Sequence, residues 1–243
     1  MTHLPRSPWK GYAWPMSIWQ RIGEAISALA SGEPLSAVFS RLSTPPERSV
    51  AFTIAVIALG AKMAKADGQV TRDEVAAFRD VFHIPPGEEA NAARVFNLAR
   101  SDVSGYDGYA RQITRMFGPG AATLEDVLDG LFHIAVADGE YHEGENAFLE
   151  HVAEIFGVGE RCFQMLKARY APEQADPYAI LGLDPDDDDA TVRKRWRELV
   201  RETHPDRMIA RGVPEEAVQL ATKRLAEING AYERIQGARA TTS

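Results

Sequence analysis

The stretch that decides the fold of this chain is DPYAILGLDPDDDDATVRKRWRELVRETHPDR, residues 176–207. It opens with Asp176-Pro177, a capping residue followed by a proline at the first helical position, and Gly182 ends a brief helix. A longer helix is predicted from about Asp189 to Glu202, and the tripeptide His204-Pro205-Asp206 follows it directly. The stretch therefore predicts two helices joined by an acidic turn, with the tripeptide at the end of the second helix.

The longer helix has two different faces. Val192, Trp196 and Leu199 recur at helical spacing, which is typical of a face that packs against a core, while arginines occupy another face. A loop through Gly212-Val213-Pro214 leads into a final helix, whose inward positions we expect to be Leu220, Leu225, Ile228, Tyr232 and Ile235. We expect the two long helices to lie antiparallel, with the tripeptide at the tip.

Together these residues resemble the J domain of DnaJ-family proteins. The resemblance rests on Asp-Pro-Tyr-x-x-Leu-Gly-Leu, the basic second helix, His-Pro-Asp-Arg, and a third helix that carries Glu227-Ile228-Asn229-x-Ala231-Tyr232-Glu233. A lone His-Pro-Asp is common by chance, so the order and spacing of the four elements give the match its specificity. Thr203 departs from the family pattern, because many J domains have an aromatic residue there, and Glu198 interrupts the basic helix. These departures predict weaker binding, or binding tuned to one chaperone.

The resemblance implies a contact role for the tripeptide, which in J domains engages the ATPase domain of a DnaK-type chaperone and its linker. The basic helix would then offer a cationic face to an acidic surface of that chaperone, where complementary charge mainly speeds and orients the encounter. The predicted chaperone-binding residues are His204, Pro205, Asp206, Arg207, Arg193, Lys194, Arg197 and Arg201. The alternative is that His204 only caps a helix end, that Pro205 only stops the helix, and that the cations form a solvated face.

The segment before the J-like region predicts helices throughout. Ile18, Ile22 and Ile26 fall at helical spacing between Ser17 and Leu29. Further helices are predicted near residues 50–65, 72–82, 88–100, 105–117, 121–137, 143–156 and 159–170. Glycine and proline clusters separate them, and Thr71 and Thr123 are the expected N-caps. The fold class predicted for the whole chain is all-α.

An internal repeat runs through this helical segment. The stretch from Met63 to Glu74 recurs from Ile134 to Glu145, and each copy passes through Ala-Asp-Gly to an acidic residue in the next helix. This predicts a bundle with an internal two-fold repeat, which looks like the TerB-like fold named from tellurite-resistance proteins. A TerB-like domain followed by a C-terminal J domain is the arrangement of DjlA-type proteins.

That arrangement implies an adaptor, in which the helical domain selects an unknown client protein and the J domain recruits the chaperone. The expected boundaries are a disordered tail at 1–16, a TerB-like domain at 17–170, a linker at 171–175 and a J domain at 176–238. Because Met16 heads the first patterned segment, the residues before it are either disordered or come from an upstream start codon.

DjlA-type proteins are often anchored by an N-terminal membrane helix, and no transmembrane span is predicted here. The longest apolar run, Val50 to Ala61, is well short of the about 20 residues that a span needs and predicts a buried helix. With the single cysteine Cys162, which excludes an internal disulfide and a Cys-rich zinc site, this favours the cytoplasm. Peripheral attachment at the inner membrane through the helix that bears Trp19 stays open, although packing on the bundle is favoured.

Composition also narrows the function. A formal net charge of −8 argues against a nucleic-acid partner, even with an arginine-rich helix. The sequence shows no glycine-rich phosphate loop and no nucleophile motif, so we expect neither an enzyme activity nor a cofactor.

A metal-responsive stress protein is the alternative function. Clustered carboxylates suit hard cations, and the repeat could bring together Asp67, Glu74, Asp138 and Glu145. Capping of two equivalent helix starts explains the same acids, so they are candidates only and no metal ligand is assigned.

Overall fold

The computed structural model describes residues 17–29, 33, 35, 37–38, 47–66, 81, 84, 87–101, 105–137, 139, 141–170, 176–214 and 218–242. Every regular element within these ranges is a helix, which confirms the all-α prediction. The expected tail at 1–16, the linker at 171–175, the helix near 72–82 with Thr71, and most of the first copy of the repeat lie outside them.

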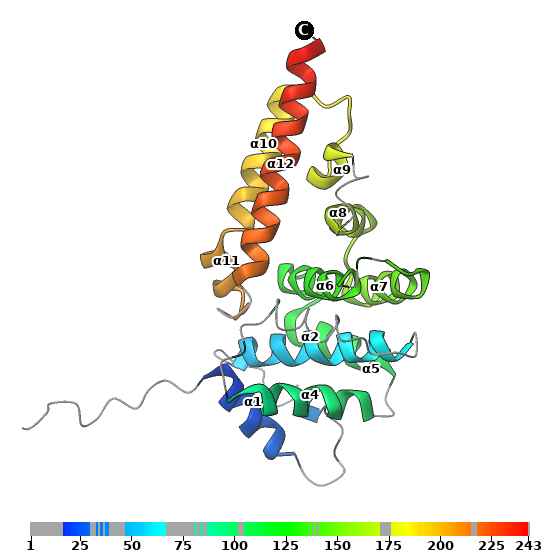
Figure 1. Ribbon diagram of the computed structural model, residues 1–243, viewed down its shortest axis with the longest axis vertical. Coiled ribbons are helices and arrows are strands. Elements are labelled where there is room, and N and C mark those ends of the chain that lie inside the picture. Colours follow the sequence, from blue (N-terminus) through cyan, green and yellow to red (C-terminus); the bar gives the residue numbers. More distant parts are fainter. Residues whose placement is uncertain are drawn as a thin grey trace, which may run out of the picture.

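The N-terminal domain is a bundle arranged around one central helix (Figure 1). The central helix is α2 (Glu47–Ala66), and its middle stretch is buried almost without a break. The helices packed around it are α1 (Ile18–Ser27), α4 (Glu89–Ser101), α5 (Tyr106–Phe117), α6 (Ala122–Ala135) and α7 (Glu143–Phe156). Helix α8 (Glu160–Tyr170) packs on α6 instead. The predicted helices that fall on described residues are therefore confirmed, and Trp19 packs in the core with no exposed surface.

Local signals set most of the helix ends in this bundle. Ser17 accepts a hydrogen bond from the backbone N–H of Gln20, whose side chain bonds back to Ser17, and this capping box starts α1. Gly157 ends α7 in the left-handed conformation, with φ of 71°. The prediction that Thr123 caps α6 was wrong, because Ala121 stands at the cap position. The Thr123 hydroxyl instead donates to the carbonyl oxygen of Arg211 in the C-terminal domain, at 3.1 Å.

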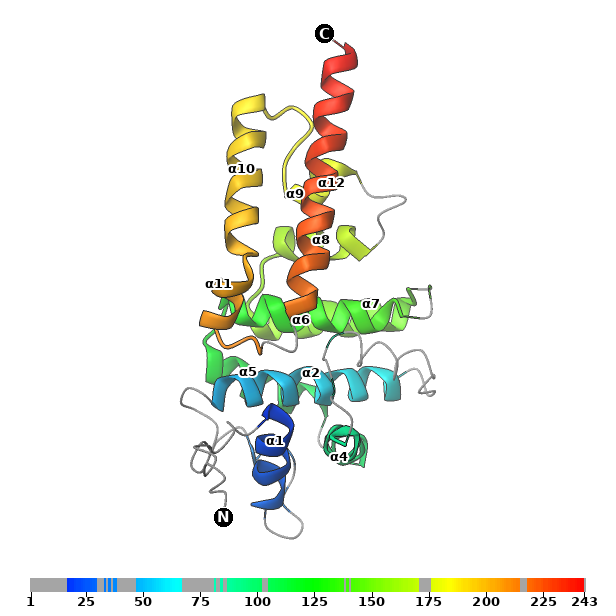
Figure 2. The ribbon, with the colours of Figure 1, turned by 60° about the vertical axis from the view of Figure 1, so that its left-hand side comes forward.

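The C-terminal domain is a helical hairpin braced by a short helix. The hairpin pairs α10 (Asp189–Glu202) with α12 (Val218–Thr242), which lie side by side and antiparallel (Figures 1 and 2). Helix α9 (Pro177–Leu181) begins at Asp176, whose side chain accepts from the Tyr178 N–H, and ends at Gly182. Trp196 of α10 stacks on Tyr232 of α12, with ring centroids 4.5 Å apart. The domain core is formed by Met165 of α8 with Ile180, Leu181, Val192, Leu199, Ile228, Ala231 and Ile235.

A short helix that the sequence did not predict, α11 (Pro205–Ala210), occupies the tip of the hairpin. In the alternative interpretation Pro205 stops α10, and no helix was predicted in the loop that leads to the final helix. Proline also suits the first position of a helix, because it needs no amide donor there and its φ is already helical, and Pro205 starts α11 in this way. Thr203 is the C-cap of α10 and His204 is the N-cap of α11, so only these two residues separate the two helices.

The two domains share a hydrophobic core at this tip. Met208 and Val213 are almost fully buried, as are Leu220 and Ala221 at the start of α12, and all four belong to the same buried cluster as α2 and α6. Met165 reaches in the opposite direction, from α8 into the C-terminal core. The hairpin therefore projects from the bundle, and its tip packs into the bundle core (Figure 2).

None of the described helices is both long and apolar enough to cross a membrane.

Candidate functional site

The tripeptide forms an exposed, capped helix start. His204 is the N-cap of α11, and its Nδ1 accepts a hydrogen bond from the backbone N–H of Asp206 at 3.2 Å. The side chain of His204 is 57% exposed and that of Asp206 is 87% exposed. The capping interpretation of His204 is thus correct as local geometry, and most of its imidazole surface stays available to a partner.

A shallow groove runs beside the tripeptide. Its apolar lining comes from Trp196 and Val200, and its polar and charged lining comes from Arg197, Arg201, His204, Asp206 and Arg207. Ile209 of α11, close to the tripeptide, is 39% exposed, the largest exposed fraction of any described large apolar side chain. The groove combines an apolar strip with charges of mostly one sign, which suits an extended acidic segment with apolar side chains.

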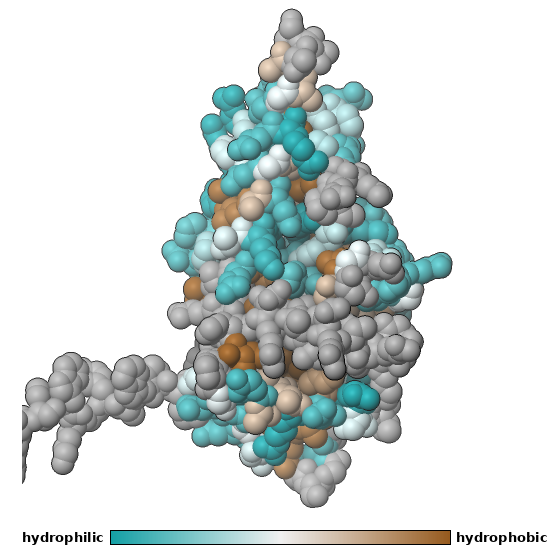
Figure 3. Space-filling view, in the orientation of Figure 1, coloured by the Kyte–Doolittle hydropathy of each residue, from teal (hydrophilic) through white to brown (hydrophobic). Residues whose placement is uncertain are grey.

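A second groove along α10 gathers the predicted cations. Arg193, Lys194, Arg197 and Arg201 line it together, and all four side chains are exposed. Within the described part of the chain, none of these four side chains forms an ion pair. Figure 3 shows a mainly hydrophilic surface over the hairpin. The structure thus brings the basic residues to one outer surface that is continuous with the tripeptide groove.

The two departures from the J-domain pattern lie toward the bundle. Thr203 is 3% exposed, and it lines a cleft between α10 and the N-terminal domain. Glu198 also lines that cleft and pairs with Arg195 at 3.7 Å. A small residue therefore precedes His204 at the point where the hairpin faces the N-terminal domain. The charge of Glu198 is paired with Arg195 of the same helix.

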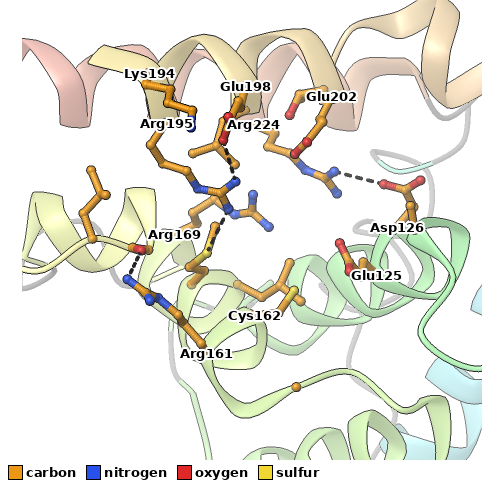
Figure 4. A pocket seen from close by; sticks show the side chains of 18 of the residues that line it. Glu125, Asp126, Arg161, Cys162, Arg169, Lys194, Arg195, Glu198, Glu202 and Arg224 are labelled. Atoms are coloured by element: carbon orange, nitrogen blue, oxygen red, sulfur yellow. Dashed lines mark hydrogen bonds and ion pairs between the residues drawn. The ribbon is translucent and has the colours of Figure 1, made fainter. Parts of the chain in front are cut away.

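The cleft itself has a volume of about 790 Å³ and lies between α6, α8 and α10 (Figure 4). It contains Cys162, and burial, reinforced by Glu125, raises the pKa of this thiol to about 12. A thiol with such a pKa stays protonated at neutral pH and is a poor nucleophile. The cleft therefore offers no activated cysteine.

The candidate metal ligands are only partly described. Glu145 is buried, and its carboxylate accepts from the backbone N–H of His142 at 3.0 Å, which is the capping role that we favoured. Asp67, Glu74 and Asp138 lie outside the described residues. Among the residues described, no three or more His, Cys, Asp or Glu side chains come together as a metal site would require.

The sequence interpretation missed the charged residues between the domains. Asp126 and Asp129 of α6 are buried, as are Arg169 of α8 and Arg224 of α12. A signal was available, because these two aspartates flank Val127 and Leu128 in an apolar helix where a solvated face is not expected. Their partners are distant in sequence, so the pairing itself was not readable.

Two family models match the chain, one for each domain. Residues 53–168 match the family described as Tellurite resistance protein TerB, and residues 176–239 match the DnaJ domain. The order of the two domains is the one that the sequence predicted.

Curated proteins resemble the chain across both domains. The Co-chaperone protein DjlA of Aliivibrio fischeri is 26% identical over 224 residues, which is 78% of this chain and 79% of that protein. The protein of the same name from Escherichia coli strain K12 is 24% identical over 217 residues, 78% of this chain and 80% of its own. That of Vibrio parahaemolyticus is 27% identical over 232 residues, 82% of this chain and 81% of its own. No solved structure gives a significant match.

Proposed function

Because the chain is a J-domain co-chaperone of the DjlA type, with a TerB domain followed by a DnaJ domain, we propose that it binds a DnaK-type chaperone through the tip of its hairpin and stimulates ATP hydrolysis there. The contact residues in this proposal are the tripeptide His204-Pro205-Asp206, with Arg207, and the outer cations of α10. The chemical step belongs to the partner, and no enzyme activity is proposed for this chain.

The observation that carries the proposal is the exposure of the tripeptide. The TerB domain buries the opposite side of the tip through Met208, yet leaves His204 and Asp206 open to solvent. A partner could reach both side chains without any movement of the two domains.

The charges on α10 support the same proposal through the rate of encounter. Exposed cations on one surface attract an acidic partner over roughly a Debye length, about 8 Å at physiological ionic strength. Asp189 and Glu198 line the same groove, but the four cations outnumber them and none forms an ion pair with a described carboxylate, so a net positive field remains. We therefore assign them to steering and orientation, and the tripeptide to the contact that promotes hydrolysis.

The TerB domain would act as the adaptor for a client or partner. It would thereby determine where the activated chaperone acts. We propose a cytoplasmic setting, since the single, largely buried Cys162 suits a reducing compartment.

The test is the steady-state ATPase rate of the host's DnaK-type chaperone with the full-length chain added. We expect wild type to raise the rate and His204→Gln to lose the increase while keeping its fold, because a glutamine oxygen can still accept from the Asp206 N–H. His151→Gln is the matched control, since the His151 side chain is 42% exposed but lies on α7 of the TerB domain. Full stimulation by a folded His204→Gln protein would contradict the proposal.

A further inference from the structure

A network of charged side chains joins the two domains beneath the tip. Asp126 of α6 faces two arginines of the J domain, and part of this arrangement is visible at the edge of the cleft in Figure 4. Its Oδ1 accepts from Nη1 of Arg224 at 2.9 Å. Its Oδ2 accepts from Nη2 of Arg211 at 2.7 Å and from Nε of the same residue at 3.1 Å. Both oxygens of one TerB-domain carboxylate are therefore bonded to the J domain.

Asp129, one turn further along α6, extends the network. Its Oδ2 accepts from Nη2 of Arg224 at 2.6 Å and from Nε at 3.2 Å. Its Oδ1 accepts from Nη2 of Arg169 on α8 at 3.0 Å. Arg224 thus bridges the two aspartates, and its guanidinium supplies every one of its nitrogens to the TerB domain.

Burial makes the network dependent on docking. The side chains of Asp126 and Asp129 are 1% and 3% exposed, and that of Arg224 is 9% exposed. Burial alone would raise the pKa of Asp129, but Arg224 and then Arg169 outweigh it, so the pKa is lowered and the carboxylate stays charged. While the J domain is docked, loss of its arginines would leave Asp126 buried without any hydrogen bond of this network, and a buried carboxylate without partners is strongly unfavourable.

Arg211 connects this network directly to the tripeptide. It is the C-cap of α11, the helix that the tripeptide begins. Its Nη1 donates to the carbonyl oxygen of Glu202 at 3.1 Å, at the end of α10, and its own carbonyl oxygen accepts from the Thr123 hydroxyl of α6 at 3.1 Å. One arginine therefore ties the residues on both sides of the tripeptide to helix α6.

We propose that Asp126 and Asp129 of the TerB domain are positioning residues for the chaperone-contacting tip, acting through Arg211 and Arg224 of the J domain. The two domains then form one rigid unit, in which the TerB domain holds the tripeptide in its binding geometry and presents its own client at a fixed orientation to the chaperone. This inference rests on the proposed function, but its structural half can be measured without a chaperone.

The experiment uses the full-length chain with Asp126→Asn, which keeps the size of the side chain and removes its charge. Hydrogen exchange measured by mass spectrometry should quicken in α11 and in the first half of α12, but not in α9. In titrations of chaperone ATPase, the concentration for half-maximal stimulation should rise about fivefold or more while the maximal rate is kept, because a loosened tip must be ordered again on binding.

Two further variants guard against simple unfolding. Arg211→Gln removes one side of the link and leaves Asp126 paired with Arg224, so it should fold and show the same two changes. Arg211→Lys keeps a cation within reach of Asp126 and should restore the half-maximal concentration at least in part. Asp107→Asn is the matched control, because Asp107 pairs with Arg111 at 2.8 Å within the TerB domain alone.

The possible outcomes separate the two proposals. Wild-type stimulation together with unchanged exchange and unchanged half-maximal concentration in Asp126→Asn would overturn the positioning role and leave the proposed function standing. Faster exchange with unchanged stimulation would establish the docking but overturn its role in presenting the tip. No stimulation by wild type would defeat the proposed function, while the exchange comparison would still decide whether Asp126 docks the J domain.

Discussion

Arginines occupy two contrasting settings in this protein. On the outer face of α10, Arg193, Arg197 and Arg201 are exposed and line a groove without a described ion pair. Between the domains, Arg169 and Arg224 are buried and bonded to Asp126 or Asp129. An exposed cation contributes little to stability and acts on partners, whereas a buried one is held by partners whose removal is costly. In our proposal, the same residue type therefore serves recognition on the outer face of α10 and architecture between the domains.

The largest effect on stability should come from removing an arginine of the buried network. Arg224→Met leaves Asp126 and Asp129 without their shared partner, so we expect a loss of about 3–5 kcal/mol in the free energy of unfolding. Arg193→Met, the same change on the outer face, should stay within about 0.5 kcal/mol of wild type. Urea unfolding of both variants measures the difference, and equal losses would remove the contrast.

Substitutions on the outer face of α10 should change the rate of association with the chaperone. Reversing two charges, with Arg197→Glu and Arg201→Glu together, should slow association with a DnaK-type chaperone by about tenfold at low salt, and the effect should shrink as salt is added. The melting temperature should not change. Stopped-flow binding across a range of ionic strength gives the measurement, and Arg115→Glu, on exposed α5 surface, is the control. A salt-independent loss would point to direct contact rather than steering.

The carboxyl group of Glu227, close to the buried ion pairs between the domains, should make the stability of the folded chain depend on pH. Burial, and then Asp129, raise the pKa of Glu227 from an ordinary 4.5 to about 7. The folded chain therefore keeps a proton that the unfolded chain has lost, so stability falls as pH rises from about 4.5 to about 7 and stays reduced above it.

Glu227→Gln removes this ionisation. Relative to wild type, the variant should be more stable at pH 8 than at pH 5 by about 1–2 kcal/mol, allowing for the partial exposure of the group. Thermal unfolding at the two pH values tests this. A gain that is larger at pH 5 would show that the sign is wrong.

The smallest effect is expected from an exposed aspartate. Asp107→Asn breaks an i,i+4 pair with Arg111 on α5, and both side chains are more than a third exposed. The free energy of unfolding should change by about 0.5 kcal/mol or less. Chemical unfolding beside Asp126→Asn compares one substitution in two environments, and similar losses would mean that burial does not set the energy of these aspartates.

Local signals allowed the sequence to predict most of the fold. Asp176, Pro177 and Gly182 act on residues next to them, so the start and end of α9 were readable. The apolar periods of α2 and α10 likewise depend only on sequence spacing. Helix α11 was missed because a proline that cannot continue one helix is well suited to begin another, and the sequence alone does not say which applies.

Long-range partners explain what the sequence did not predict about the site. The hydroxyl of Thr123 and the carboxylate of Asp126 both bond to Arg211, far along the chain, so neither contact leaves a local pattern. Exposure of Arg193 and burial of Arg224 follow from which side of the hairpin meets the TerB domain. The roles of the tripeptide and its neighbouring cations stay predictions that resemblance motivates and exposure supports.

The most direct test of chaperone binding by the outer face of α10 is photo-crosslinking with the full-length chain. One variant carries a photo-crosslinking amino acid in place of Arg201, and the reference variant carries it at position 115 of α5. A DnaK-type chaperone is added with ATP, and the crosslinked product is identified by mass spectrometry. The account predicts a crosslink to the chaperone from position 201 and none from position 115. A chaperone crosslink from position 115 alone would contradict it.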